Sequence, residues 1–390
     1  MKILLVADQL YHSNNGTTIS ARRFAVVLRA HGHDVRCVSA GTEKDVPQGE
    51  TAYLMGKYKV PFFDGLITAQ GMVIAKADED LLREAVLWAD VVHFLMPFPL
   101  AKCGLKLCME TGTAYTAAFH VQPENISYSI NMGRSKPVNA GIYKWMHGYF
   151  YKYVKHIHCP SSFIAGELVK NGYDNEIHVV SNGIDPVFVY EKHEKRPELE
   201  GKFVILSVGR YSNEKRQDLL LEAVQKSKYS DSIQVVLAGR GPNEKKLARM
   251  AKKLANPPIM HFFTKPELLD IMAESDLYVH CAEAEIEAMA CMEAFARGLV
   301  PVIANSKKSA TPQFALTRKC LFRPGDAKNL AAHIDYFIEH EEERKELEHA
   351  YAKSAANYKL DDCVCKVEEM FRLAIKENEE KRAEADEATE

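Results

Sequence analysis

The sequence has few of the features that mark a membrane-spanning or a disulfide-rich chain. No stretch of it approaches the roughly 18 uncharged apolar residues that a membrane-spanning helix needs, although such a chain can still lie on a membrane. The nine cysteines show neither a CxxC pair nor a zinc-type spacing, which indicates a reducing cytoplasm. The opening MKILLVADQL reads as a strand, because it has no extended apolar core and no small-residue cleavage site of a signal peptide.

The sequence also lacks a strong excess of charge of one sign. Its formal net charge is −3, so the whole molecule is not drawn to nucleic acid, and 47% apolar with 26% charged residues is typical of a soluble globular chain. The charge is nevertheless uneven along the chain. Residues 101–156 hold seven Lys and Arg against two acids, a net of +5, and residues 377–390 hold seven acids against two bases, a net of −5.

No short repeat or low-complexity segment appears outside that charged tail, and apolar runs instead alternate with amphipathic patterns. This alternation predicts parallel sheets with helices on both faces. The expected strands are Lys2–Ala7, Asp34–Val38, Val91–Leu95, Ala114–Phe119, Ile157–Cys159, His178–Val180, Phe203–Val208, Gln234–Ala238, Met260–Phe262, Leu277–His280 and Val300–Ala304. The expected helices include Thr18–Arg29, Gln217–Gln225, Asn243–Leu254 and Met289–Arg297.

The alternation occurs twice, which fits the length of 390 residues and predicts two α/β domains. The first series ends near Asp185 and the second begins at Phe203, with a polar, proline-containing stretch between them. We therefore expect two facing Rossmann-like domains with an interdomain cleft. The predicted boundaries are an N-terminal domain over 1–190, a linker over 191–202, a second domain over 203–355, a helix over 356–376 that crosses back to the first domain, and a charged tail over 377–390.

Two cations follow the apolar strand that begins the second domain. Gly209 permits a tight turn there, and Arg210 and Lys215 stand five residues apart, so that a planar fork and a point charge can converge on one pyrophosphate. The alternative is an ordinary solvated loop. A second glycine turn at Gly239 follows the next strand, and it fits a phosphate loop or a plain strand-to-helix turn equally well.

Two glutamates stand eight residues apart, Glu285 before a helix and Glu293 inside it. Glu285 can reach sugar hydroxyls from the loop, Glu293 can accept both hydroxyls of a ribose, and the amides that open the helix at Met289 can meet a phosphate. Glutamates on a helix more often mark a solvated face. Here the helix is apolar nearly all round, so Glu293 is predicted to be buried and to need a partner.

Taken in order, these segments resemble the retaining glycosyltransferases of family 4, which have the GT-B fold. The Glu-x7-Glu signature of that family is carried by Glu285 and Glu293, and its Arg and Lys diphosphate clamp by Arg210 and Lys215. Further blocks match at Asn14-Asn15-Gly16-Thr17, Cys159-Pro160-Ser161-Ser162 and Ser181-Asn182-Gly183-Ile184-Asp185. The resemblance covers nearly the whole chain, and it implies that donor-binding residues include Gly16, Thr17, Gly209, Gly239, Ile286, Glu287, Ala288 and Met289.

The sequence departs from the family pattern after the first glutamate. Many members have a glycine-containing turn there, whereas this chain has Ile286, Glu287 and Ala288. The amide contacts to the donor are therefore open, and Glu287 rivals Glu285 as the residue that contacts the sugar.

A histidine, His120, ends an apolar strand of the first domain. A lone histidine in such a place is more often structural. The resemblance, however, places a histidine at this position beside the anomeric centre of the donor sugar. The block from His120 to Asn125 is also similar to one in bacterial transferases that glycosylate membrane lipids.

Aromatic residues recur with helical spacing between Val138 and His156, with three lysines off the stripe. This pattern fits an amphipathic helix packed on its own domain, or a basic and aromatic face that rests on anionic lipid. The net charge of +5 over 101–156 and two apolar loops favour the second interpretation. The predicted acceptor or membrane residues are Phe62, Phe63, Phe98, Trp145, Tyr149 and Phe150.

The resemblance implies transfer of glucose or galactose from a UDP-sugar, with retention of configuration, to a hydroxyl of diacylglycerol or ceramide. His120, Arg210, Lys215 and Glu285 are the expected catalytic residues. The triplet Asp78-Glu79-Asp80 has the Asp-x-Asp spacing, but it begins an expected helix and is interpreted as charge that favours the helix dipole, so no metal or other cofactor is expected. The enzyme is expected on the inner face of the cell membrane. Two alternatives stay open: a soluble sugar or polysaccharide acceptor, and a nucleotide-sugar epimerase or non-catalytic nucleotide-sugar-binding protein.

Overall fold

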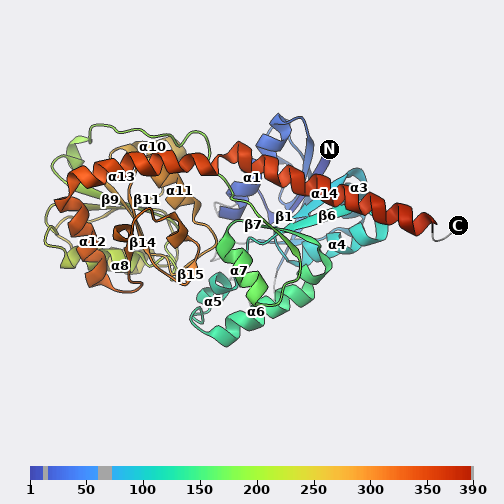
Figure 1. Ribbon diagram of the computed structural model, residues 1–390, viewed down its shortest axis with the longest axis horizontal. Helices are drawn as coiled ribbons and strands as arrows, with labels where there is room; N and C mark the ends of the chain where they lie inside the picture. The colour runs from blue at the N-terminus through green and yellow to red at the C-terminus, as the bar shows by residue number, and fades with distance from the viewer. Residues whose placement is uncertain (12–15, 60–72, 388–390) are drawn as a thin grey trace. The chain divides into compact units, whose positions relative to one another are not determined.

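The computed structural model describes residues 1–11, 16–59 and 73–387, and the chain divides into two compact units (Figure 1). The first unit consists of Met1–Pro123, Ser135–Gly183 and Leu360–Glu390, and the second of Glu124–Arg134 and Ile184–Lys359. Within the described ranges, no helix is long and apolar enough to cross a membrane. All nine cysteines lie in those ranges and are free thiols.

The first unit is built on an eight-stranded sheet in the order β4-β3-β2-β1-β5-β6-β7-β8. Every neighbouring pair is parallel except β3 and β4. The strands are β1 (Lys2–Gln9), β2 (Asp34–Ala40), β3 (Thr51–Tyr58), β4 (Ile74–Lys76), β5 (Val91–Phe94), β6 (Ala114–Ala118), β7 (His156–Cys159) and β8 (Glu176–Val179). The helices are α1 (Gly16–Ala30), α3 (Glu79–Trp88), α4 (Pro99–Thr111), α6 (Lys136–Tyr149), α7 (Ser162–Lys170) and α14 (Leu360–Glu387).

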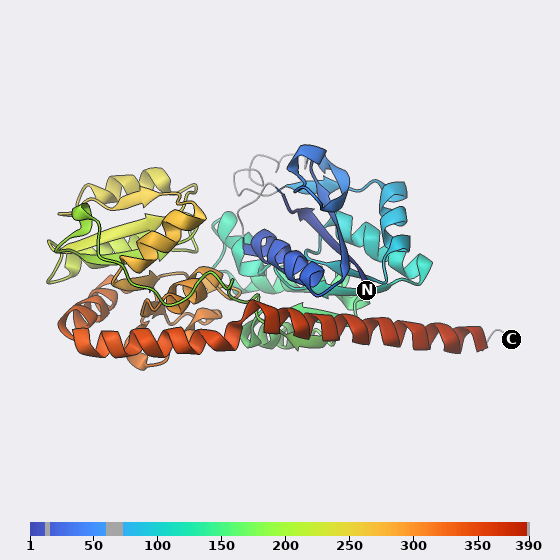
Figure 2. The same ribbon diagram turned by 90° about the horizontal axis from the view of Figure 1, so that it is seen from above.

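Helix α14 belongs to the core of the first unit although it ends the chain. Its apolar residues Val364, Val367 and Phe371 are buried in one cluster with residues of α1 and β1, and Figures 1 and 2 both show α14 beside α1. Gly183 lies against the start of this helix with φ +74°, and a Cβ there would come within 2.6 Å of the Leu360 Cα. The glycine of that block therefore permits a close approach of two backbones.

The second unit contains a six-stranded parallel sheet in the order β11-β10-β9-β12-β14-β16. Its strands are β9 (Phe203–Val208), β10 (Ile233–Ala238), β11 (Ile259–His261), β12 (Leu277–His280), β14 (Pro301–Ala304) and β16 (Leu321–Phe322), and β13 (Ala284–Glu285) pairs with β15 (Lys308–Ser309). The helices are α8 (Gln217–Lys226), α9 (Glu244–Ala251), α10 (Lys265–Ala273), α11 (Met289–Ala296), α12 (Ala327–Glu339) and α13 (Glu341–Ser354). The chain order reverses between β9 and β12, and parallel sheets bind ligands beyond the strand ends at such a point.

The prediction of two Rossmann-like α/β domains with parallel sheets is confirmed. All the predicted strands are present, with ends within two residues of the prediction. Strand β3 was missed because only Tyr53 and Met55 of its eight residues are buried, so its apolar signal is weak. The short strands β4, β13, β15 and β16 were also missed.

Three of the predicted boundaries differ from the structure. The stretch 191–202, expected as a linker, is part of the second unit, where ion pairs hold Glu191 to Arg297 and Arg196 to Glu274, each at 2.6 Å. Residues 124–134 also belong to the second unit rather than the first, and helix α5 (Pro123–Ser129) leads into them. Helix α14 continues through most of the expected charged tail and ends at Glu387.

The single aromatic helix predicted up to His156 is wrong. Helix α6 ends at Tyr149, a 3-10 turn follows over Tyr151–Tyr153, and β7 begins at His156. The helix ends here because Phe150 and Tyr151 are fully buried, which turns the chain into the core before the next strand starts.

Candidate functional site

Two of the predicted site residues meet at the carboxyl ends of β9 and β12. The Lys215 ammonium contacts Oε1 of Glu285, and Nε2 of His280 lies 3.4 Å from the same oxygen. Burial raises the pKa of Glu285, but Lys215 and His280 outweigh it and bring the pKa down to about 2. Glu285 is therefore an ionised carboxylate at neutral pH, although only 8% of it is exposed.

Arg210, the other predicted cation, is held within its own loop. Its Nη2 lies 3.1 Å from Oε1 of Glu214, and the Ser212 hydroxyl donates to the same oxygen. The Arg210 side chain is 37% exposed and that of Lys215 is 23% exposed. A guanidinium has five N–H donors and an ammonium three, so a cation that holds a carboxylate can also bind a phosphate oxygen.

The two glycine turns of the second unit lie backbone against backbone. A Cβ on Gly239 would come within 2.0 Å of the Gly209 carbonyl oxygen, and one on Gly241 within 2.6 Å of the backbone N and O of Tyr211. The Tyr211 amide donates to the carbonyl of Arg240 at 2.9 Å. Gly239 therefore has a packing role that the sequence left open: it lets the loops after β9 and β10 touch.

The loop that departs from the family pattern adopts a conformation that suits glycine. Ala288 has φ 68° directly before α11 begins at Met289. A residue with a side chain in this left-handed region costs roughly 1 kcal/mol. Glu287 is 2% exposed and Glu293 is 8% exposed, so both side chains are buried, in agreement with the apolar surroundings of the helix.

Sequence reasoning missed a fourth carboxylate, Glu283, two residues before Glu285. It accepts a hydrogen bond from the Tyr128 hydroxyl at 2.5 Å and from Nη2 of Arg134 at 2.7 Å, and it also pairs with Arg216. Burial raises the pKa of Glu283, but its three partners outweigh it and lower the pKa to about 2.

Glu283 is linked to the candidate site through its ion pair with Arg216. Arg216 follows Lys215 directly and has φ 53°, a left-handed conformation that is rare for a residue with a side chain. Glu283 thus fixes the loop that presents Lys215 and, through Tyr128 and Arg134, the segment 124–134 as well. A clue existed in the sequence, because Glu283 stands among the small apolar residues Cys281, Ala282 and Ala284, where a buried acid needs a cation.

His120, in the first unit, follows β6 and is 8% exposed. It lines a small cavity together with His93 and His158, and its ring lies perpendicular to that of His158 with centroids 5.3 Å apart. Burial, and to a smaller extent His158, lowers the pKa of His120 to about 3. The imidazole is therefore neutral at physiological pH and can act through hydrogen bonds rather than as a cation.

Gly16 and Thr17 open helix α1 in the first unit, beyond the carboxyl end of β1. The Thr18 hydroxyl donates to the Gln9 carbonyl at 3.2 Å, which ties the start of this helix to the strand. Amides of a first helical turn lack partners within the helix and favour an anion. The neighbouring Asn14 and Asn15 lie outside the described residues.

Part of the predicted acceptor face is exposed. Trp145 is 51% exposed and stacks on Tyr149 with ring centroids 5.3 Å apart, and Tyr153 is 39% exposed. The ammonium groups of Lys102 and Lys152 lie 4.0 and 4.7 Å from the centre of the Tyr153 ring. These five residues, Lys102, Trp145, Tyr149, Lys152 and Tyr153, form what we call the basic-aromatic patch.

Other residues predicted for that face do not lie on it. Phe150 is fully buried, so its assignment to the acceptor or membrane is wrong: its ring packs edge-on against those of Phe94 and Tyr151. Phe98 is half-buried and packs on the core of the first unit. Phe62 and Phe63 lie outside the described residues.

Two family profiles cover most of the chain. The profile of Glycosyltransferase Family 4 matches residues 14–188, and that of Glycosyl transferases group 1 matches residues 189–354. With its two Rossmann-like domains, the chain is a glycosyltransferase of the GT-B type.

The chain is also similar to individual proteins and solved structures. A GDP-mannose-dependent alpha-mannosyltransferase of Corynebacterium glutamicum is 26% identical over 322 residues, which cover 78% of this chain and 72% of that protein. Anabaena HepE in complex with UDP and glucose superposes with a TM-score of 0.72 at 14% identity, over 95% of this chain and 99% of that one, and shows the same fold. The catalytic domain of cholesterol-alpha-glucosyltransferase from Helicobacter pylori is 50% identical, with a TM-score of 0.39, over 40% of this chain and 99% of that domain.

Proposed function

We propose that this glycosyltransferase moves glucose or galactose from a UDP-sugar to a hydroxyl of a membrane lipid, diacylglycerol or ceramide, with retention of anomeric configuration. The observation that carries the donor half is the ion pair of Lys215 with the ionised Glu285 at the point where the strand order of the second unit reverses.

In the proposed donor site, positively charged groups bind the diphosphate and carboxylates bind the hydroxyl groups of the sugars. Arg210, Lys215 and the amides that open α11 stabilise the negative charge that develops on the leaving diphosphate. Because these groups supply the positive charge, the proposed mechanism uses no metal ion. Glu285 accepts hydrogen bonds from sugar hydroxyls, with Glu287 as its rival for this role, and Glu293 accepts those of the ribose.

In the first unit, we assign His120 to the reacting end of the sugar. Its low pKa makes it a neutral imidazole, which can accept or donate one hydrogen bond near the anomeric carbon without adding charge there.

The acceptor half of the proposal rests on the basic-aromatic patch. Exposed aromatic rings flanked by lysines suit the interface of an anionic bilayer, where rings sit at headgroup level and ammonium groups meet lipid phosphates. We propose that this patch holds the enzyme on the inner face of the cell membrane and brings the lipid hydroxyl within reach.

A second candidate donor is GDP-mannose. Both curated relatives, from Corynebacterium glutamicum and Mycolicibacterium smegmatis, carry that donor in their names. The roles proposed for Arg210, Lys215 and Glu285 concern the diphosphate and the hexose rather than the base, so they do not distinguish the two donors.

A panel of donors and acceptors tests the proposal. The purified full chain is incubated with UDP-glucose, UDP-galactose or GDP-mannose against vesicles of diacylglycerol, ceramide or cholesterol and against soluble sugars, and products are identified by mass spectrometry. We expect a hexosyl lipid and UDP. A mannosyl product alone would establish the second donor, a glycosylated soluble sugar alone would refute the lipid acceptor, and a changed nucleotide sugar without any acceptor would indicate an epimerase.

A further inference from the structure

Strands β7 and β8 of the first unit place two histidines and a glutamate on one face of the sheet. His156 is the register partner of Glu176, and His178 lies two residues further along β8 on the same face. Nδ1 of His156 lies 3.1 Å from Nε2 of His178 and 3.2 Å from Oε2 of Glu176. The three ligand atoms lie within 4.8 Å of one another.

The contact of Nε2 of His156 indicates which nitrogen of the imidazole ring carries the hydrogen. Nε2 of His156 lies 3.0 Å from Oε2 of Glu377 on α14, and a carboxylate only accepts, so this nitrogen donates. In the neutral ring Nδ1 then has a lone pair, which faces the Glu176 carboxylate and a nitrogen of His178. When Nε2 of His178 carries no hydrogen, electron-pair donors of all three side chains point at one place, where a cation can bind.

The spacing of these atoms fits a tetrahedral ion. Zinc binds histidine nitrogen and carboxylate oxygen at roughly 2.0–2.1 Å, which puts tetrahedral ligands about 3.3 Å apart. The two separations that start at Nδ1 of His156, 3.1 and 3.2 Å, are close to this value. A histidine that binds a metal usually donates its second N–H to a carboxylate, as His156 does to Glu377.

We propose that His156, His178 and Glu176 bind a Zn²⁺ ion, with Glu377 orienting His156 from α14. Two imidazoles and one carboxylate are a ligand set that suits zinc, and the partly exposed Glu176 leaves the fourth position to water. The ion ties the edge strand β8 to β7 and, through Glu377, both strands to the C-terminal helix. Its role is structural, and none of its ligands belongs to the residues proposed for sugar transfer.

Lys155 is the other charged group beside this cluster. Its ammonium lies 2.7 Å from Oε2 of Glu377 and 3.4 Å from Oε1 of Glu176. It therefore neutralises carboxylate charge at the edge of the site and leaves Oε2 of Glu176 to the ion.

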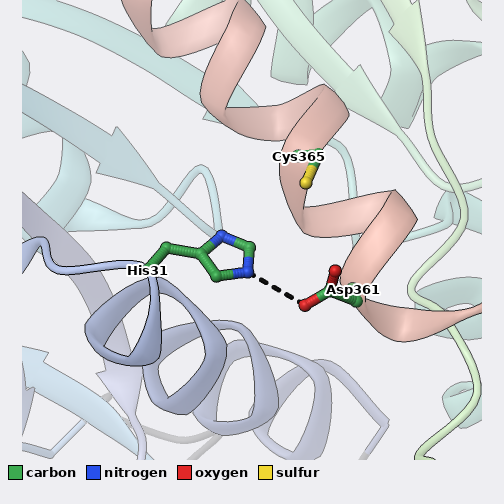
Figure 3. Close-up of side chains that lie close together, drawn as sticks. All are labelled: His31, Asp361 and Cys365. Carbon is green, nitrogen blue, oxygen red and sulfur yellow. Dashed lines mark hydrogen bonds and ion pairs between the residues drawn. The ribbon is translucent and has the colours of Figure 1, made fainter.

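A second group of possible ligands lies where α1 meets α14. His31, Asp361 and Cys365 come together there, and Figure 3 shows His31 pointing at Asp361. Both nitrogens of His31 are engaged by carboxylates, Nδ1 with Glu368 at 2.6 Å and Nε2 with Asp361 at 2.9 Å. This cluster offers one imidazole where the proposed site offers two, and its two carboxylates raise the pKa of His31, so it supplies the matched control.

Metal binding by the untagged full chain, first stripped with a chelator, tests the proposal. Zn²⁺ is titrated in competition with a chromophoric chelator, and Co²⁺ is used as a spectroscopic probe of tetrahedral geometry. We expect one tight equivalent, visible tetrahedral Co²⁺ bands and a higher Tm with Zn²⁺. His178→Ala should abolish all three, Glu377→Gln should weaken binding about 10- to 100-fold, and the control Cys365→Ser should retain them.

Two outcomes would overturn the proposal: equal Zn²⁺ affinity in wild type and His178→Ala, or loss of the tight equivalent in Cys365→Ser instead. Circular dichroism of the metal-free variants verifies that they are folded. If His178→Ala does not fold, Glu176→Gln, at a partly exposed position, replaces it with the same expected loss.

Discussion

Glu283 and Glu285 stand two residues apart in the second unit, and their partners give them different tasks. Glu285 contacts Lys215 and His280 and belongs to the proposed donor site. Glu283 holds Arg134, Tyr128 and Arg216, and so acts on the site through the loop that carries Lys215. In both, the folded pKa of about 2 lies below the ordinary 4.5, so their stabilisation is present above about pH 4.5 and lost as the pH falls toward 2.

Glu283→Gln should weaken both the fold and the donor site. The amide can still accept from Tyr128, but Arg134 loses its carboxylate partner and Arg216 keeps only Asp218, at 3.2 Å, which should lower the free energy of unfolding by about 2 kcal/mol. The displaced Lys215 loop should lower kcat/KM on the order of 10-fold. Denaturant unfolding and initial-rate kinetics measure these effects.

Glu222→Gln, on the exposed side of α8, is the matched control for this substitution. If Glu283→Gln changes stability and kcat/KM no more than Glu222→Gln does, Glu283 is not a positioning residue.

Asp8, at the end of β1, has a raised pKa, in contrast to the lowered pKa values of Glu283 and Glu285. It is 1% exposed and accepts from the Ala75 amide at 2.9 Å. Burial, which the hydrogen bond from Ala75 offsets only in part, raises its pKa from 3.8 to about 7. Because the folded pKa exceeds the unfolded one, the native state holds a proton that the unfolded chain has lost, and stability falls as the pH rises from about 4 to 7.

Asp8→Asn should therefore stabilise the protein at neutral pH. The neutral amide can still accept from Ala75, and the gain over wild type should grow between pH 4 and pH 8 to at most about 4 kcal/mol. Urea unfolding at several pH values measures it, with Asp362→Asn on α14 as the exposed control. A difference between wild type and Asp8→Asn that does not vary with pH would contradict this assignment.

Among the secondary-structure elements, helix α11 is preceded by a turn in which the sequence departs from the family pattern and the backbone is left-handed. The turn before it has left-handed geometry, which favours glycine, but the residue there is Ala288 with φ 68°. The methyl group is tolerated at the cost of strain.

Ala288→Gly should relieve that strain. We expect it to raise the free energy of unfolding by up to about 1 kcal/mol, less what glycine costs in the unfolded chain. Ala290→Gly, in the first turn of the same helix, should lower it by less than about 1 kcal/mol, because glycine is a poorer helix former than alanine. Thermal unfolding compares the two, and equal destabilisation by both would show that the turn stores no strain.

The regular elements and the burial of Glu293 could be predicted because their signals are local. Strand β9 is a continuous apolar run, and the apolar surroundings of α11 showed that Glu293 is buried. The partners of Glu283 could not be predicted, because Tyr128 and Arg134 lie 155 and 149 residues away in sequence. The end of helix α6 could not be predicted either. The aromatic residues keep a helical spacing in the sequence beyond Tyr149, but Phe150 and Tyr151 are buried and the helix ends before them.

For the molecule as a whole, the basic-aromatic patch predicts binding to anionic membranes. The full chain should co-sediment with phosphatidylglycerol vesicles, and the bound fraction should fall as salt rises, because screening weakens the lysine contribution. Trp145→Ala and Lys152→Ala should each reduce binding several-fold.

Leu87→Ala is the control, since Leu87 is 64% exposed in the same unit and lies outside the patch. Equal loss in this variant, or binding that does not depend on salt, would contradict a role of the patch at the membrane.

The most direct test of the central claim is the structure of the lipid product. Wild-type protein and Lys215→Ala are incubated with UDP-glucose or UDP-galactose and diacylglycerol or ceramide vesicles, and the extracted lipid is analysed by NMR at the anomeric proton. We predict a hexosyl lipid with the anomeric configuration of the donor, formed on the order of 100-fold more slowly by Lys215→Ala. An inverted linkage, full activity of Lys215→Ala, or no lipid-linked hexose from either UDP-sugar would contradict the account.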